Sequence, residues 1–325
     1  MTGDVDTTLD DAAAVFSTAR RRLFGIAYRM LGSTAEAEDV VQDTWLRWQG
    51  TDRSVVANPQ AFLTTTATRL AINVLQSARS RRETYVGPWL PEPVDTSADP
   101  TLGAETAEAL DVAVLVLLER LTPTERAAYV LREAFDYGYP EIAQIVGTSP
   151  AATRQLVSRA RKHLASERRN PVSDAARRDL LTAFLAAARV GDIERLEQLF
   201  AEDIVSRVDS NGAVKHVARV AVVGRYKVAR VLSSFAEIFW AGVTTEPIEV
   251  NGEEAIGMLR DGELFGVLTV IASDEGLHEA MWQMNPDKLE PLRRARAGRA
   301  APEGPDGSKD PDGSATPGPS ATARS

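Results

Sequence analysis

The sequence predicts two all-helical domains followed by a third domain of the α+β class. Apolar residues recur at helical spacing through residues 10–82 and again through residues 108–168. Residues 174–292 begin with helical patterns and end with four strand-like runs, separated by the turn sequences NGEE, RDGE and SDEG. Residues 83–107, rich in proline, glycine, aspartate, serine and threonine, predict a linker, and residues 297–325 predict a disordered tail.

Composition excludes several classes of site. The chain has no cysteine, which excludes disulfides, thiol catalysis and cysteine-based metal sites. Its three histidines, His163, His216 and His278, are scattered, so we expect no histidine metal cluster and no cofactor. The longest apolar run lies within Leu110–Leu118 and is too short to span a bilayer, and the acidic start MTGDVDTTLDD does not resemble a signal peptide. We therefore expect a soluble cytoplasmic protein.

The net charge of −9 is spread unevenly along the chain. Residues 61–82 contain four arginines and no acid, and residues 153–169 contain six bases against one acid. Between them, residues 92–111 contain six acids and no base. Two basic segments separated by an acidic one predict a polyanionic partner that is met at two places. The acidic total predicts weak non-specific DNA binding by the chain alone, because it offsets the attraction to phosphates.

The first helical domain carries one acidic and one basic surface. In GSTAEAEDVVQDTWLRW, Ser33 is placed to cap a helix, and Glu36 completes a capping box. The face opposite the apolar one gathers Glu38, Asp39, Gln42 and Asp43. A later helix starts after Pro59, and its basic end offers Asn73, Gln76, Arg79, Arg81 and Arg82. Such a charge run is usually a solvated face, but beside a second basic helix it indicates a nucleic-acid surface.

The second helical domain predicts a helix-turn-helix. Residues 122–125, TPTE, combine a helix cap, a proline and a glutamate three positions after the cap. Gly147 ends one later helix, and Ser149 and Pro150 begin the next, with Thr153 at an inward position. The exposed side of that next helix carries Arg154, Gln155, Ser158, Arg159, Arg161 and Lys162. Arginine and glutamine read guanine and adenine in the major groove, so the pattern predicts DNA binding; the alternative is a solvated basic helix.

The α+β domain is predicted from the order of its elements. Helices are expected at about 174–189, 192–200 and 224–240, with a short strand, DIVSRVD, before the last of them. The runs VTTEPIEV, EEAIGMLR, ELFGVLTVIA and GLHEAMWQM then predict an antiparallel meander. Helices followed by such a meander argue for a domain separate from the two helical ones.

Three segments, in order, resemble bacterial sigma factors. AEDVVQDTWLRW is similar to the segment that binds core RNA polymerase. NPQAFLTTTATRLAINVLQSARSRR resembles the adjoining helix that melts and reads the minus-ten promoter element. LTPTERAAYVLREAFDYGYPEIAQIVGTSPAATRQLVSRARKHL resembles the region that binds the minus-thirty-five element. Their spacing over residues 10–168 is similar to that of extracytoplasmic-function sigma factors, which keep only these two domains.

This resemblance implies a role for each surface. The acidic face at residues 38–43 would dock on core polymerase, and the helix end from Asn73 to Arg82 would capture unstacked minus-ten bases. The helix at 150–165 would read the minus-thirty-five element, and the acidic segment Asp95–Asp111 would run through the RNA channel of the polymerase. The implied partners are core RNA polymerase and promoter DNA, with no membrane partner and no enzymatic activity.

The rest of the chain resembles the sigma-J-like subgroup, whose members carry a fused SnoaL-like domain, a cone-shaped α+β barrel. The motifs WLPEP at 89–93 and NPDKL at 285–289 carry the resemblance, and DSNGAVK at 209–215 is the counterpart of a third motif, DGGGK or DGGGR. The resemblance implies that this domain regulates in cis, with no separate anti-sigma factor required. The residues expected in the regulatory contact are Trp89, Leu90, Pro91, Asp209, Asn285, Pro286, Asp287, Lys288 and Leu289.

The stretch YVGPWLPEP, at the start of the linker, predicts a docking peptide. Its three prolines favour an extended chain and lower the cost of ordering it. Trp89 and Leu90 would expose a large apolar area unless they pack on another surface. We expect them to pack on the C-terminal domain near NPDKL, with Lys288 meeting Glu92 in an exposed pair that contributes little. Such a clamp would fix how far apart the two DNA-binding domains sit.

Other functions stay open at this level. The SnoaL-like fold often encloses a pocket in which an acid and a histidine transfer protons, and Asp209 and His216 are candidates; DSNG as a surface turn beside a solvated histidine is the simpler interpretation. His278, Trp240 and Trp282 fit structural positions. The alternatives to a sigma factor are a one-component regulator with a ligand-binding C-terminal domain, and a cyclase- or isomerase-like enzyme with a nucleic-acid-binding leader.

Overall fold

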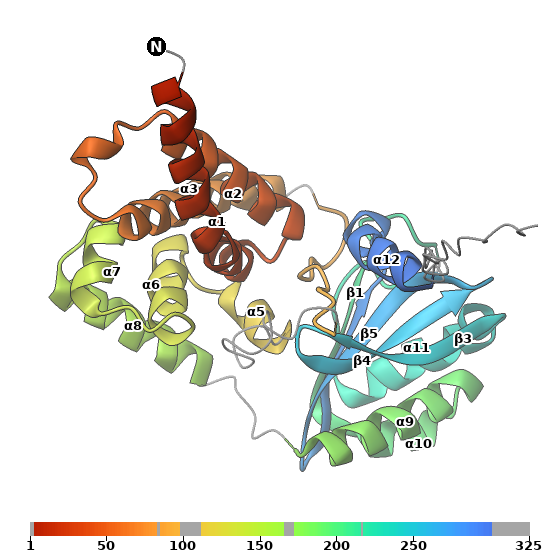
Figure 1. Cartoon of the computed structure of the whole chain (residues 1–325). Helices are drawn as coiled ribbons and strands as arrows, with labels where there is room; N and C mark the ends of the chain where they lie inside the picture. Colours follow the sequence, from red (N-terminus) through yellow and green to blue (C-terminus); the bar gives the residue numbers. More distant parts are fainter. Residues whose placement is uncertain (1–2, 83–84, 98–111, 166–171, 216, 301–325) are drawn as a thin grey trace, which may run out of the picture.

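The computed structural model describes residues 3–82, 85–97, 112–165, 172–215 and 217–300 (Figure 1). The side chains of residues 3–8, 78–82, 113 and 298–300 are not among the described ones. Most of the acidic segment, His216 and the tail from residue 301 onward therefore lie outside the described residues.

The first helical domain consists of α1 (Gly3–Leu31), α2 (Thr34–Gln49), a 3-10 turn (Arg53–Val55) and α3 (Pro59–Arg82). The predicted cap of α2 is present, since the Ser33 hydroxyl accepts a hydrogen bond from the Glu36 backbone N–H at 3.3 Å. Trp48 is buried at the end of α2 and donates from its indole nitrogen to the carbonyl of Ala12 at 3.1 Å. This bond and the packing around it fix α2 against α1.

The second helical domain consists of α5 (Val112–Leu118), α6 (Pro123–Glu133), α7 (Tyr139–Val146) and α8 (Pro150–Ala165). Thr122 and Glu125 form the predicted capping box at the start of α6. Gly147 ends α7 in the left-handed region at φ 72°, which a residue with a side chain rarely adopts. The α7–turn–α8 unit is the helix-turn-helix that the sequence predicts.

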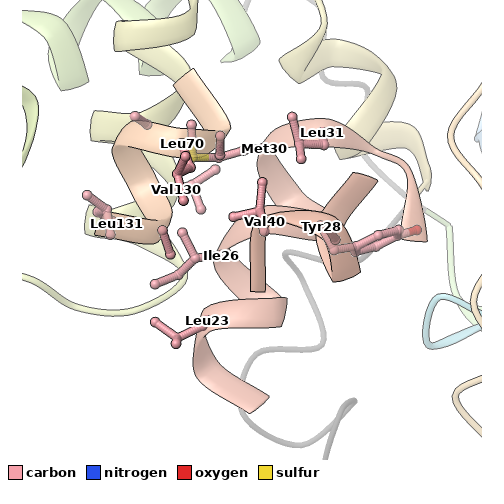
Figure 2. Close-up of a cluster of buried hydrophobic side chains, with 14 of the residues drawn as sticks. Leu23, Ile26, Tyr28, Met30, Leu31, Val40, Leu70, Val130 and Leu131 are labelled. Carbon is pink, nitrogen blue, oxygen red and sulfur yellow. The ribbon is translucent and has the colours of Figure 1, made fainter. Parts of the chain in front are cut away.

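The two helical domains pack around one shared core rather than two. In Figure 2, Leu70 of α3 and Val130 and Leu131 of α6 lie in the same cluster as Ile26 and Met30 of α1. Polar bonds cross the same interface: Arg126 donates to the carbonyl of Met30 at 2.6 Å, and Arg69 of α3 donates to two carbonyls at the end of α7. Burial lowers the pKa of Arg126 to about 9, so its guanidinium is still charged at neutral pH.

The C-terminal domain is an open six-stranded sheet with helices on both faces (Figure 1). The strand order is β2-β1-β6-β5-β4-β3, and every neighbouring pair is antiparallel except β1 and β6, which are parallel. The elements are α9 (Asp174–Val190), α10 (Ile193–Leu199), β1 (Phe200–Asp209), β2 (Val222–Val223), α11 (Arg225–Trp240), β3 (Val243–Val250), β4 (Glu253–Arg260), β5 (Glu263–Ser273), β6 (Gly276–Gln283) and α12 (Pro286–Ala300).

Neighbouring residues of β5 show how the two faces are covered. Leu268 belongs to the core beneath α9, α10 and α11, whereas Val267 packs against Leu289 and Leu292 of α12 on the other face. The predicted strands β3 and β4 have the bounds that the sequence indicated, and β5 and β6 differ by one residue at the end. The helix α12 and the short strand β2 were not predicted. Among the described residues, none of the helices is both long and apolar enough to cross a membrane.

Candidate functional site

The linker stretch from Trp89 to Val94 lies between the helical unit and the C-terminal sheet (Figure 1). Leu90 is only 1% exposed and packs with Met281 of β6 and Val112 of α5. Val94 exchanges hydrogen bonds with Asn251, at the turn between β3 and β4, and Asp95 forms a β-bridge with Val250. The linker is therefore a packed part of the molecule, held on both sides.

A buried ion pair holds the backbone of Leu90. The Lys288 Nζ and the Asp209 Oδ2 lie 2.7 Å apart, and the two side chains are 8% and 0% exposed, respectively. The Asp209 carboxylate accepts from the Leu90 N–H at 2.8 Å, and the Lys288 ammonium donates to the Leu90 carbonyl at 2.6 Å. The same ammonium lies 4.1 Å from the centroid of the Trp89 ring, a cation–π contact. We call Trp89, Leu90, Asp209 and Lys288 the linker clamp.

Further polar side chains complete the surroundings of Asp209. The Tyr85 hydroxyl donates to Asp209 at 2.6 Å and accepts from the Asn285 amide at 2.8 Å. Burial and the nearby Asp209 carboxylate raise the pKa of Tyr85, so the phenol stays protonated and keeps donating. Gln283 of β6 donates to the carbonyl of Pro91 at 3.0 Å. The Asp209 carboxylate thus has a donor on each side, as a buried charge requires.

Asp209 contradicts the interpretation of DSNG as a surface turn, because its carboxylate is fully buried at the end of β1. The turn residues Ser210–Gly212 follow it, and Asn211 and Gly212 have positive φ angles. Periodicity alone carries no signal for this burial, because an aspartate followed by Ser-Asn-Gly is typical of an exposed turn. The counterpart motif DGGGK was the signal that pointed to Asp209.

The expected pair of Lys288 with Glu92 is wrong. Glu92 faces the helical unit instead, where its carboxylate accepts from the Ser33 hydroxyl at 2.7 Å and from the backbone N–H and hydroxyl of Thr34. A carboxylate at the N-terminus of α2 satisfies free N–H groups and interacts favourably with the helix dipole. Tyr28 adds a bond from its hydroxyl to the Glu92 carbonyl at 2.7 Å. The linker therefore connects the clamp directly to the start of α2.

The structure brings only part of the predicted regulatory set together. Trp89, Leu90, Pro91, Asp209, Asn285 and Lys288 meet at the clamp. Pro286, half-buried, and Asp287, exposed, form the first turn of α12, and Leu289 packs into the core beneath that helix. Sequence reasoning missed Tyr28, Tyr85, Asn251 and Gln283 at this interface. No local pattern marks these four residues, because their partners lie far away in the sequence.

The predicted polymerase-binding residues share one exposed face of α2. Glu38, Asp39, Gln42 and Asp43 are all exposed, and Glu38 pairs with Arg20 at 2.7 Å. Leu46 lies on the same face and is 56% exposed, which the sequence reasoning missed. The four predicted residues are therefore accessible to a partner, whereas a single exposed leucine is common on protein surfaces and adds no evidence by itself.

The predicted DNA-binding residues of α3 and α8 lie on helix surfaces. Asn73 and Gln76 are exposed on α3, and Arg79, Arg81 and Arg82 lie in its last turns, with side chains outside the described ones. On α8 all six predicted residues, Arg154, Gln155, Ser158, Arg159, Arg161 and Lys162, are exposed.

Three of the α8 arginines also make contacts within the protein. Arg159 pairs with Glu125 at 3.1 Å and Arg161 pairs with Glu133 at 2.7 Å, and both acids belong to α6. Arg154 lies 5.3 Å from the centroid of the Tyr139 ring of α7. Thr153 is buried as predicted, and its hydroxyl donates to the Ser149 carbonyl at 3.0 Å.

The C-terminal domain contains a small, mostly apolar cavity. This cavity of about 50 Å³ is lined by Phe239, Trp240, Trp282 and other apolar residues together with the hydroxyl-bearing Ser206, and Asp209 is not part of its lining. Trp282 is a buried core residue, and His278 bonds to Ser273 and Asp203, a structural arrangement. The Asp209 carboxylate is occupied by the clamp, so the geometry gives no support to a catalytic acid at this position.

Comparison with known proteins identifies the class of protein. Residues 15–81 match the family model described as "Sigma-70 region 2", and residues 104–164 match the one described as "Sigma-70, region 4". With the relative described next, these matches show that the chain belongs to the extracytoplasmic-function family of RNA polymerase sigma factors. It is an alternative sigma factor, a transcription initiation factor that directs core RNA polymerase to promoters.

The similarity to one group of relatives covers almost the whole chain. The chain is 38% identical over 301 residues to the ECF RNA polymerase sigma factor SigJ of Mycobacterium tuberculosis, covering 87% of this chain and 95% of the relative. It is 27% identical over 295 residues to the probable ECF sigma factor SigI of the same species, covering 89% and 98%. The crystal structure of M. tuberculosis SigJ superposes with a TM-score of 0.67 at 34% identity, covering 86% and 98%.

These similarities extend through the C-terminal domain, which has the SnoaL-like, cone-like α+β fold that the sequence predicts, with a sheet that stays open. The family assignment decides against the one-component regulator and the cyclase-like enzyme as the function of the whole chain.

Proposed function

We propose that the C-terminal domain regulates this sigma factor in cis by holding regions 2 and 4 in a closed arrangement through the linker clamp. The observation that carries the proposal is the Lys288–Asp209 pair, which binds both the N–H and the carbonyl of Leu90. Breaking a buried pair by removing one partner costs about 3–5 kcal/mol, so the clamp is a strong tie between linker and domain.

The closed arrangement supports a regulatory role because promoter binding demands a longer reach. By their names the minus-ten and minus-thirty-five elements lie about 25 base pairs apart, or about 85 Å along a straight duplex. Here α3 and α7 are in direct contact through Arg69, and both helical domains share one core. Regions 2 and 4 must therefore separate before α3 and α8 can engage both elements of one promoter.

In this proposal each exposed surface keeps the role that the sequence implies. The α2 face of Glu38, Asp39, Gln42, Asp43 and Leu46 docks on core polymerase, and α3 engages the minus-ten element from Asn73 to Arg82. The α8 residues read the minus-thirty-five element, where Gln155, Ser158 and Lys162 are available as they stand. Arg159 and Arg161 leave their α6 carboxylates to bind DNA. Both arginine side chains are more than half exposed, so solvent screens the pairs and the exchange costs little.

The first experiment measures the distance between α2 and α8 when the clamp is broken. Because the chain has no native cysteine, Gln49→Cys and Ala165→Cys introduce one label site on each exposed helix end. At limiting core polymerase, the Asp209→Asn and Lys288→Met backgrounds should show a longer mean label distance and more promoter-specific run-off transcript than the unmodified chain. The polymerase is needed in both measurements because the shared core of regions 2 and 4 still has to open on it. The double variant should show non-additive effects, since both residues act through one pair.

The matched control removes an exposed ion pair of the same domain, with Arg178→Gln and Glu254→Gln. This control should leave both the label distance and the transcript level unchanged. Unchanged distance and transcription in the Asp209 and Lys288 variants, with the fold intact, would refute regulation through the clamp.

A further inference from the structure

One segment of the C-terminal domain is basic although the chain as a whole is acidic. Residues 210–236 contain five bases and no acid, against a net charge of −9 for the chain. These bases are Lys215, Arg219, Arg225, Lys227 and Arg230, and all five are exposed. We call these five residues the basic edge, because they lie in the segments before and after β2, one of the two edge strands of the sheet.

The basic edge is a cluster of bases without ion pairs, in a domain where most of the other bases with described side chains are paired with a carboxylate. Within the part of the chain that the structure describes, no carboxylate lies within ion-pair distance of any of its five side chains; Arg230 packs against the exposed ring of Tyr226 at 5.5 Å. Elsewhere in the domain, carboxylates pair with Arg177, Arg178, Arg207, Lys288, Arg294 and Arg296. An uncompensated cluster of cations attracts an anionic partner.

The basic edge begins beside the linker segment that follows α3. Residues Tyr85–Gly87 follow α3 closely in the chain and lie against the loop after β1. A Cβ atom on Gly87 would be 3.5 Å from the carbonyl oxygen of Arg219, and one on Gly212 would be 3.3 Å from a methyl group of Val86. The loop that carries Lys215 and Arg219 therefore packs on a segment that begins three residues after the last residue of α3.

The basic edge then extends away from that point along the sheet. Val223 of β2 pairs with Val205, and the Gly224 N–H donates to the carbonyl of Ile204 at 2.8 Å. Arg225, the first residue of α11, therefore lies beside Ile204. Ile204 precedes Asp209 by five residues along β1, a distance of roughly 17 Å at the usual rise of a strand. This length corresponds to about five base pairs of duplex DNA.

We propose that the basic edge is a further DNA-binding surface, which contacts backbone phosphates of promoter DNA beside the minus-ten element, at the end where α3 finishes. Exposed lysine and arginine side chains bind phosphates without reading sequence, so this surface adds affinity at every promoter. It also offsets the acidic total of the chain locally. The inference rests on the sigma-factor activity of the family and on the packing of Tyr85–Gly87 against the C-terminal domain. It does not require that the clamp regulates transcription.

The test measures how promoter binding by the reconstituted holoenzyme depends on salt. The variants are Lys215→Gln with Arg219→Gln, and Arg225→Gln with Lys227→Gln, in the full chain. The slope of log affinity against log salt should fall by about 0.9 for each lost phosphate contact, so by up to about 2 for each double variant. The loss should be the same for promoters with different sequences beside the minus-ten element.

The control is the double variant Arg178→Gln with Arg195→Gln, two exposed arginines on α9 and α10 that carry the same change in charge. A salt slope equal to that of this control would overturn the proposal. Weaker binding of the basic-edge variants to core polymerase without DNA would also overturn it, because the surface would then serve an acidic face of the polymerase. A different outcome would refute only the cis regulation: the basic-edge variants lower the salt slope as expected, but the Asp209 and Lys288 variants leave label distance and transcription unchanged.

Discussion

At the scale of single residues, charged side chains connect the parts of this protein. Glu92, Asp209 and Lys288 are 7%, 0% and 6% exposed. Buried charges are tolerated only when they are paired and hydrogen-bonded, and each of these three has partners from a distant segment. Their placement turns a linker into a connection between the C-terminal sheet and the start of α2.

Glu92→Gln tests this connection on its helical side. The amide cannot accept all the hydrogen bonds that the carboxylate receives from Ser33 and Thr34, and the favourable charge at the α2 N-terminus is lost. We expect the free energy of unfolding to fall by about 1–3 kcal/mol in urea titrations. Glu202→Gln, an exposed carboxylate of β1, is the control and should change it by less than about 0.5 kcal/mol. Equal effects of the two changes would contradict the role of Glu92.

At the scale of elements, helix starts are specified by local chemistry. The capping box predicted at α6 is present with both of its bonds. At α2 a capping box was also predicted, and the structure records its Ser33 half, the bond from the Glu36 N–H to the Ser33 hydroxyl. Burial acts to raise the pKa of Glu125, but hydrogen bonds with Thr122 and Arg159 outweigh it and lower the pKa. Glu125 therefore both caps the start of α6 and binds Arg159 of α8.

The pH dependence of stability tests the role of Glu125. When folding lowers the pKa of a carboxyl group, that group stabilises the folded state at pH values above its unfolded-state pKa of about 4.3. This contribution is lost as the pH falls through the lower pKa of the folded state. Glu125→Gln should therefore lower stability by about 0.5–1 kcal/mol at pH 7 and by less at pH 3.5, measured by urea unfolding. Glu237→Gln, exposed on α11, is the control. A deficit that is the same at both pH values would contradict this account.

At the scale of the whole molecule, regions 2 and 4 form one cooperative unit. Leu131 of α6 is 0% exposed and lies in the same core as Ile26 and Leu70 (Figure 2). The C-terminal domain has a separate core around Phe184 and Leu268, and the linker clamp joins the two units. Opening of regions 2 and 4 therefore exposes apolar surface, and core polymerase or promoter DNA has to compensate for it.

Leu131→Ala tests the shared core. Removing a buried leucine side chain costs about 2–5 kcal/mol, and here the loss should reach region 2 because the core is common. We expect faster amide hydrogen exchange in α1 and α3 as well as in α6, with the β4–β6 strands unchanged. Leu268→Ala, equally buried in the C-terminal core, should give the reverse pattern. Normal protection of α1 and α3 in the Leu131 variant would refute a common core.

Much of the backbone and of the exposed surfaces could be predicted from the sequence. The turn sequences NGEE and RDGE place Asn251 and Asp261 at positive φ, which fixes the ends of β3 and β4. The exposed residues of α2 and α8 follow from helical periodicity. The prediction of the clamp residues Trp89, Leu90, Asp209 and Lys288 rested on family motifs. Such motifs identify the residues but do not specify which of them are in contact.

What the sequence by itself determined is therefore local: where helices and strands begin and end, which faces are apolar, and which family the chain resembles. Only the tertiary structure decided that Asp209 is buried, that Glu92 binds α2 rather than Lys288, and that two helical domains share a core. The physical reason is sequence distance. The bond from Asn251 to Tyr28 joins residues 223 positions apart, and no periodicity or cap can encode a partner that far away.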